Sequence, residues 1–185
     1  MIGGAIFTDD LKRSKFPYRK DCYALAFPGI KQIQDNPHDG ALQRLGVDCL
    51  VSFNNGGLIS IDEKVRGTNA KTGKCYNDIA IEEFSDEKGK KPGWLLKESK
   101  CDFVAYVIGP LGIVHILPFK PLLEAWLANG ESWKQWAKPI RAWNNGYTTL
   151  SWGIDVETVF AAVPGCFSVP CTPFEPNYEK QTVPT

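Results

Sequence analysis

Two acidic residues and one lysine stand at a spacing that suits metal-assisted chemistry. Asp48 is separated by thirteen residues from Asp62-Glu63-Lys64, which lies in a run rich in isoleucine and valine, typical of a strand. Because successive strand residues point to opposite faces, Asp62 and Lys64 share one face and Glu63 points to the apolar side. We expect Glu63 to lie near a strand end, where its carboxylate reaches water.

Two carboxylates beside an ammonium group suit the hydrolysis of a phosphodiester. Magnesium prefers oxygen ligands, keeps several of its waters, and is commonly held by one or two carboxylates together with a substrate phosphate. Such a metal lowers the pKa of a bound water and neutralises the charge that develops on the phosphate. Lys64 would orient the attacking water or stabilise the transition state. The expected cofactor is therefore Mg²⁺ or Mn²⁺.

The hairpin signal Asn54-Asn55-Gly56-Gly57 decides whether Asp48 can join this face. A two-residue loop at Asn55-Gly56 pairs Asp48 with Glu63, whereas a three-residue loop at Asn55-Gly56-Gly57 pairs Asp48 with Lys64. The second register gathers Asp48, Asp62 and Lys64 on one face, and it supplies the left-handed glycine that three-residue hairpins require. We therefore favour the second register.

Asp48 followed by Asp62-Glu63-Lys64 on a second strand resembles the signature of the PD-(D/E)XK nuclease superfamily. That superfamily includes restriction enzymes, Holliday-junction resolvases and recombination exonucleases. The resemblance implies a restriction-endonuclease-like fold acting on DNA, with Asp48 and Asp62 as metal ligands and Lys64 as the catalytic lysine. Val47 stands where the signature has a proline.

A wider segment, from Asp39 through Gln43 and Gly46 to Gly93-Trp94, resembles uncharacterised phage and plasmid members of the superfamily. In such members an acidic residue on the preceding helix often completes the site, and Asp39 is the matching residue. The resemblance also suggests Gln43 as a substrate contact and implies the processing of phage or mobile-element DNA. It covers residues 38 to 128 and leaves the two ends of the chain unmatched.

Further charged residues near this site are candidates for supporting roles. Glu82 shares the polar face of the next expected strand and is a candidate third metal ligand, although exposure to solvent explains it equally well. The loop that follows Lys64 carries no acidic residue before Asp78. Its basic residues, which either clamp a phosphate backbone or are simply solvated, are Arg66, Lys71 and Lys74.

The elements that must position these residues alternate between strands and helices. We expect strands at 47–53, 58–65, 78–84, 101–108 and 113–117, and helices at 38–45 and 119–128. This order predicts an α/β fold with a mixed central sheet and a catalytic β-hairpin flanked by helices. Residues 8–36 are expected to be irregular or to form short helices, and the proline-rich residues 166–185 to form a coil tail.

Length and composition favour one soluble domain, which we place at residues 1–165. Twenty-one basic and 21 acidic residues give a net charge of zero among 185 residues, so a surface that binds nucleic acid must be local. No apolar secretion segment or membrane span is visible, so we expect a cytoplasmic protein, with DNA as its partner and a homodimer left open.

Zinc and histidine chemistry are disfavoured. The six cysteines form no Cys-x-x-Cys pair, and the two histidines, His38 and His115, are far apart and are interpreted as structural. Tryptophans 133, 136, 143 and 152 alternate with basic residues, a mixture that elsewhere stacks exposed bases. Core packing is the favoured interpretation because Trp133 and Trp136 stand at helical spacing.

Two other functions stay open. One is a nucleic-acid-binding module of the same fold that cleaves weakly, or an interaction protein whose acidic residues are structural. The other is an enzyme that acts on RNA, which nothing in the residues excludes.

Overall fold

Two β-sheets form the framework of the structure, a computed structural model that describes residues 16–35, 45–69, 72–97, 101–144 and 146–176. The six-stranded sheet has the order β1-β2-β3-β6-β7-β10, and the four-stranded sheet has the order β5-β4-β9-β8. The strands of the six-stranded sheet are β1 (Ile30–Asp35), β2 (Cys49–Phe53), β3 (Leu58–Arg66), β6 (Phe103–Ile108), β7 (Ile113–Pro118) and β10 (Phe167–Pro170). Those of the four-stranded sheet are β4 (Asp78–Asp86), β5 (Lys91–Pro92), β8 (Lys138–Asn144) and β9 (Tyr147–Asp155).

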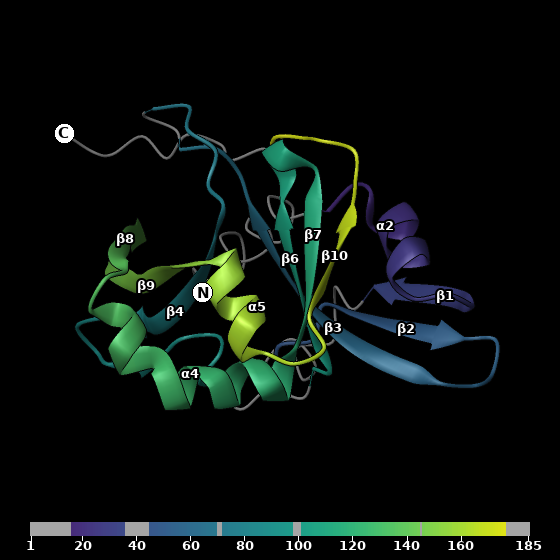
Figure 1. Ribbon diagram of the computed structural model, residues 1–185, viewed down its shortest axis with the longest axis horizontal. Coiled ribbons are helices and arrows are strands. Elements are labelled where there is room, and N and C mark those ends of the chain that lie inside the picture. The colour runs from purple at the N-terminus through teal and green to yellow at the C-terminus, as the bar shows by residue number, and fades with distance from the viewer. Residues whose placement is uncertain (1–15, 36–44, 70–71, 98–100, 145, 177–185) are drawn as a thin grey trace, which may run out of the picture.

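The expected α/β class with a mixed sheet is confirmed. In the six-stranded sheet β3 and β6 run parallel, and the other neighbouring strands run antiparallel. Helices α2 (Arg19–Ala26), α4 (Phe119–Lys134) and α5 (Val156–Ala162) accompany the sheets, and a short 3-10 turn (Gly109–Leu111) joins β6 to β7. Figure 1 shows α2 and β1 at one side of the molecule, β4, β8 and β9 at the other, and α4 along one edge.

The alternation of side chains along the central strands divides the core into two parts. In β6, Ala105 and Val107 pack with Tyr23 of α2 on one face of the six-stranded sheet. Val104 and Tyr106 point to the other face, where they pack with residues of β4, β9, α4 and α5. The sheet is therefore covered on both faces, which explains the nearly continuous burial of β6 and β7.

Helix α4 is longer than its sequence pattern indicates. We expected it to end before Asn129-Gly130, but it continues to Lys134. A side chain at position 130 would press on the Trp126 ring, since an added Cβ would lie 3.1 Å from it. The Trp126 and Trp133 rings stand 6.2 Å apart on the buried side of the helix. Tertiary packing thus outweighs the cost of about 1 kcal/mol that glycine imposes within a helix.

Several elements are absent from the expectations. The short helix α2 agrees with the prediction for residues 8–36, but β1 does not, and strands β8 and β9 were not expected. Most residues of β8 are exposed, so the alternating apolar pattern of a strand is missing. The predicted helix at 38–45 lies outside the described residues.

The tail prediction was wrong where β10 forms. β10 pairs with β7 as an edge strand of the six-stranded sheet. Its last residue, Pro170, is tolerated there because an edge strand need not donate every ladder hydrogen bond.

The tryptophans divide between core and surface. Trp133 is buried as expected, but Trp136 and Trp143 are 50% and 55% exposed, so core packing was the wrong expectation for these two. The helices described by the structure include none that is both long and apolar enough to span a membrane.

Two leucines of α4 test this packing directly. Leu122 is fully buried in the core, whereas Leu127 is 70% exposed. Leu122→Ala should lower the free energy of unfolding by about 2 to 5 kcal/mol, because it leaves a cavity among packed side chains. Leu127→Ala should change it by less than about 0.5 kcal/mol. Urea unfolding of both variants measures these values, and equal losses would contradict the orientation of α4.

Candidate active site

The β2–β3 hairpin turns through three residues, Asn54, Asn55 and Gly56. The Phe53 N–H donates to the Gly57 carbonyl at 2.9 Å, and Gly56 has a φ of +85°, the left-handed position of such a turn. A three-residue loop was expected, but one residue further along the chain. Cys49 consequently pairs with Ile61 and Leu50 with Ser60.

Asp48 stands immediately before β2 and lies beside Asp62. Its N–H donates to the Ile61 carbonyl at 2.9 Å, and its Oδ2 accepts a 2.7 Å hydrogen bond from the Glu63 N–H. The Asp48 side chain thereby takes the place of a backbone acceptor at the end of the β2–β3 ladder. The expected pairing of Asp48 with Lys64 is wrong, but the even shift of two residues preserves the faces, so Asp48, Asp62 and Lys64 still come together.

Charge and burial compete at Asp62. The residue is 4% exposed, and the Lys64 Nζ lies 2.5 Å from its Oδ1. Burial raises the pKa of Asp62 to about 7; Lys64 opposes this shift and the neighbouring Asp48 adds to it. The pKa of Lys64 is also raised: burial alone would lower it, but the Asp62 and Asp48 carboxylates more than compensate. The ammonium group therefore keeps its charge.

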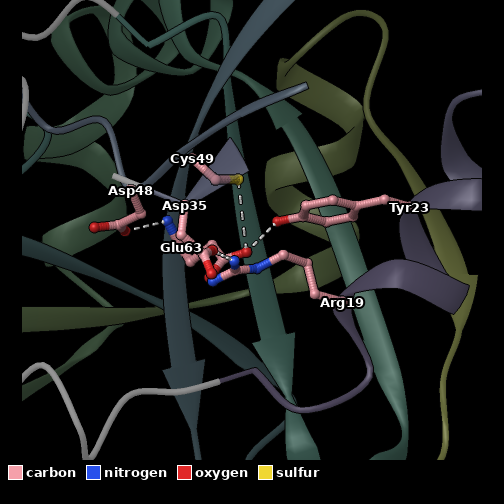
Figure 2. Close-up of polar contacts among 6 residues, drawn as sticks. All are labelled: Arg19, Tyr23, Asp35, Asp48, Cys49 and Glu63. Atoms are coloured by element: carbon pink, nitrogen blue, oxygen red, sulfur yellow. Dashed lines mark hydrogen bonds and ion pairs between the residues drawn. The ribbon is translucent and has the colours of Figure 1, made fainter. Parts of the chain in front are cut away.

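Glu63 lies on the opposite face of β3, where the structure corrects our expectation. Its carboxylate does not reach water: it is 8% exposed, accepts a 2.6 Å hydrogen bond from the Tyr23 hydroxyl, and lies 2.5 Å from the Arg19 Nη2. Figure 2 shows Asp48 at the Glu63 backbone nitrogen and the α2 side chains around the Glu63 carboxylate. β3 lies between β2 and β6, and the donors from α2 take the place of solvent at this carboxylate.

A cavity of about 580 Å³ opens between the two sheets at this point. Asp48 and Lys64 line it from the six-stranded sheet, and Glu82 and Ser151 line it from the four-stranded sheet. Trp94 completes this wall, and the Lys64 Nζ lies 5.6 Å from the centre of its ring. Asp62 is not among the lining residues; its carboxylate is buried and paired with the Lys64 ammonium group.

Glu82 reaches the cavity but does not join the two aspartates. One of its oxygens accepts a 3.2 Å hydrogen bond from the Trp94 N–H. Burial raises its pKa, and nearby Lys97 opposes the shift. Within the described ranges, no three side chains of histidine, cysteine, aspartate or glutamate form a group that could hold a metal ion. The role of Glu82 as a third ligand stays a prediction.

The expected substrate contacts have different surroundings. Arg66 forms an ion pair with Asp78 and donates to the Tyr106 hydroxyl at 3.2 Å, and its guanidinium lies 4.0 Å from the centre of the Tyr76 ring. It thus links the two sheets, and a phosphate would compete with Asp78 for it. Lys74 is exposed on the following loop. Asp39, Gln43 and Lys71 lie outside the residues that the structure describes.

The sequence did not identify the residues of α2 that contact the Glu63 carboxylate. Arg19 and Tyr23 belong to residues 8–36, which we expected to be irregular or to form short helices, and neither was a candidate site residue. A buried acid at position 63 among apolar neighbours was the available signal, because such a group requires partners. No sequence pattern could identify which residues these partners are.

No family model, no characterised protein and no solved structure matches this chain. The interpretation of the site therefore depends on its own residues and geometry.

His115 lies away from this cavity and has a structural environment. It is 3% exposed in β7, its Nδ1 is 2.8 Å from the Ser168 Oγ, and its ring meets the Phe160 ring edge-on. Burial lowers its pKa from 6.5 to about 4. His38 lies outside the described part of the chain.

This burial predicts acid sensitivity. Between pH 6.5 and about 4 the unfolded chain binds the His115 proton more readily than the folded one, so acid favours unfolding through this group. His115→Gln should reduce the loss of stability over this range by up to about 1.4 kcal/mol per pH unit. Melting curves of both proteins from pH 4 to 8 measure this pH dependence. Subtracting one profile from the other removes the contribution of the carboxyl groups, which both proteins share. Parallel profiles would contradict the prediction.

Proposed function

We propose that this chain is a divalent-metal-dependent nuclease that hydrolyses phosphodiester bonds in DNA. The observation that carries the proposal is the meeting of Asp48 and Asp62 at one end of the β2–β3 ladder, with Lys64 paired to Asp62 and facing a cavity. We further propose that the hairpin and its mixed sheet represent a restriction-endonuclease-like core. The mixed sheet and the placement of the three side chains on one face support this assignment.

The donor set fits a hard divalent cation. Asp48 and Asp62 offer carboxylate oxygens, and their mutual repulsion contributes to the raised pKa of Asp62. A cation between them would relieve that repulsion. Two carboxylates suffice for magnesium, which retains waters and takes further oxygens from a phosphate. The bound metal would supply a water of lowered pKa and neutralise charge on the phosphate.

The residues of the chain would then bind and orient the scissile phosphate. Lys64 has a 29% exposed side chain and a charged Nζ held by Asp62 Oδ1, so it can donate to a phosphate oxygen that enters the cavity. This donation strengthens as negative charge grows on that oxygen in the transition state. Water adds to phosphorus and one P–O ester bond breaks, which leaves a phosphate monoester and a hydroxyl.

One observation favours the second candidate function, a binding module that cleaves weakly. Lys64 is already engaged by Asp62, and no third ligand accompanies the two aspartates among the described residues. Binding of nucleic acid without metal-dependent cleavage would identify this alternative. Cleavage of RNA in preference to DNA would instead identify an enzyme that acts on RNA.

The central prediction concerns Asp62. Wild-type protein should degrade DNA with Mg²⁺ or Mn²⁺ and stop when EDTA is added. Asp62→Asn keeps the shape but loses a charged ligand, so cleavage should fall by about two orders of magnitude or more. Glu157→Gln, an exposed acid on α5, is the matched control and should keep wild-type activity. Full cleavage by folded Asp62→Asn protein would refute the site.

A second prediction concerns Lys74, on the loop after β3. If its ammonium group contacts phosphate, Lys74→Gln should weaken DNA binding and reduce the slope of log affinity against log salt by about 1, because one fewer counterion is released. Binding is measured with EDTA present, so that the DNA stays intact. Lys88→Gln, on the exposed turn between β4 and β5, should leave the slope unchanged. An unchanged slope for Lys74→Gln would assign Lys74 to bulk solvent.

A further inference from the structure

Helix α2 lies against the segment that follows β10, although the two are far apart in the sequence. Figure 1 shows α2 next to β10. The Phe174 ring stacks on Phe16, with ring centres 6.1 Å apart, and meets the Tyr18 ring edge-on at 5.8 Å. Two cysteines meet at this contact, Cys22 of α2 and Cys171, the residue after β10.

The Cys22 and Cys171 thiols are hydrogen-bonding partners. Cys22 is 1% exposed, whereas Cys171 is only partly buried and packs against the same apolar cluster. The backbone at Cys171 is anchored, because its N–H donates to the Gly112 carbonyl at 2.8 Å. The two sulfur atoms are therefore held together by elements that are themselves fixed, and one of the two is accessible from solvent.

This arrangement differs from that of an ordinary buried cysteine. A single buried thiol behaves as a small apolar side chain. The thiols of Cys49 and Cys166 lie against oxygen atoms, those of Glu63 and Val163. A disulfide requires side chains that already point toward each other, because cysteines that point apart cannot be bridged without movement of the backbone. The contact between Cys22 and Cys171 meets this requirement.

We propose that Cys22 and Cys171 form a redox modification site, at which a low-molecular-weight disulfide such as oxidised glutathione converts the two thiols into one disulfide bond. The Cys171 thiolate attacks one sulfur of the oxidant, which releases the first glutathione as a thiolate. The Cys22 sulfur, after losing its proton to solvent, then attacks the Cys171 sulfur of the mixed disulfide and expels the second glutathione. The protein loses two electrons and two protons, and the oxidant is reduced to two thiols.

The surroundings of the two thiols set this order of events. Burial raises the pKa of Cys22 to about 12, and the charge of a Cys171 thiolate raises it further. Burial also raises the pKa of Cys171, but the hydrogen bond from Cys22 opposes that shift. Cys171 is therefore the thiol that ionises and meets the oxidant, and Cys22 is the thiol that resolves the mixed disulfide. The exchange should be slow at neutral pH and faster at alkaline pH, because the thiolate is the nucleophile.

The bond would fasten α2 to the edge of the six-stranded sheet. It would close nearly the whole chain between the two cysteines into a loop, and a long loop loses much conformational freedom in the unfolded state. Since α2 also carries Arg19 and Tyr23, the bond would hold in place the helix that contacts Glu63. Neither cysteine lines the cavity, so the inference does not depend on the proposed nuclease function.

Oxidation of the whole chain tests the proposal. Wild-type protein is incubated with oxidised glutathione at alkaline pH, the remaining thiols are blocked with N-ethylmaleimide, and the peptides are identified by mass spectrometry. The expected product is a Cys22–Cys171 linked peptide that lacks two hydrogen atoms. The melting temperature should rise by about 5 to 15 °C and return to its starting value after reduction with dithiothreitol.

Three variants separate this bond from general thiol oxidation. Cys75→Ser removes an exposed cysteine and is the matched control, which should form the bond and gain the same stability. Cys22→Ser should keep glutathione on Cys171 as a stable mixed disulfide, because the resolving thiol is missing. Cys171→Ser should form no bond and show no rise in melting temperature. This variant changes a partly exposed residue, so it keeps the test available if Cys22→Ser does not fold.

The exposed Cys75 reports whether the oxidant has acted. If Cys75 of the wild-type protein carries glutathione while Cys22 and Cys171 remain thiols, the proposal is overturned. It is overturned equally if wild-type Cys171 retains glutathione, or if the melting temperature of Cys171→Ser rises as much as that of the wild type. The presence or absence of DNA cleavage changes none of these outcomes.

Discussion

The contact of the Glu63 carboxylate with Arg19 and Tyr23 is the constraint that joins α2 to the sheet that carries the candidate site. It places a charge in the interior, which is costly unless the charge is paired and hydrogen-bonded. α2 supplies both donors, and through Arg19 it also connects to β1. These contacts therefore join α2 to β1 and to β3, next to the residue of β3 whose carboxylate lies beside Asp48.

One strand serves two opposite electrostatic environments. On one face of β3, Glu63 is neutralised by a cation and a hydroxyl from α2. On the other face, Asp62 is paired with Lys64 but also lies beside Asp48, which raises its pKa. The first arrangement is satisfied internally. The second brings two carboxylates together with one ammonium group beside a cavity, and under the proposed function a cation and a phosphate would complete it.

The four-stranded sheet turns this face of β3 into a cavity. β4 contributes Glu82, β9 contributes Ser151, and Trp94 follows β5. Two contacts hold this sheet to the six-stranded one: Arg66 pairs with Asp78, and the Tyr106 hydroxyl accepts a hydrogen bond from the Ala80 N–H. The sheet therefore positions the walls around the site, while the hairpin supplies the charged groups.

The sequence by itself determined the hairpin, the strands around it and the shared face of Asp62 and Lys64, because these follow from a period of two and from local turn chemistry. The face of Asp48 followed as well, since the error in the register was an even number of residues. Only the tertiary structure decided which even register forms, that Glu63 is buried, and that β8, β9 and β10 complete the sheets. Those outcomes depend on partners distant in the chain, such as Arg19 for Glu63, and local spacing carries no information about which distant residues will meet.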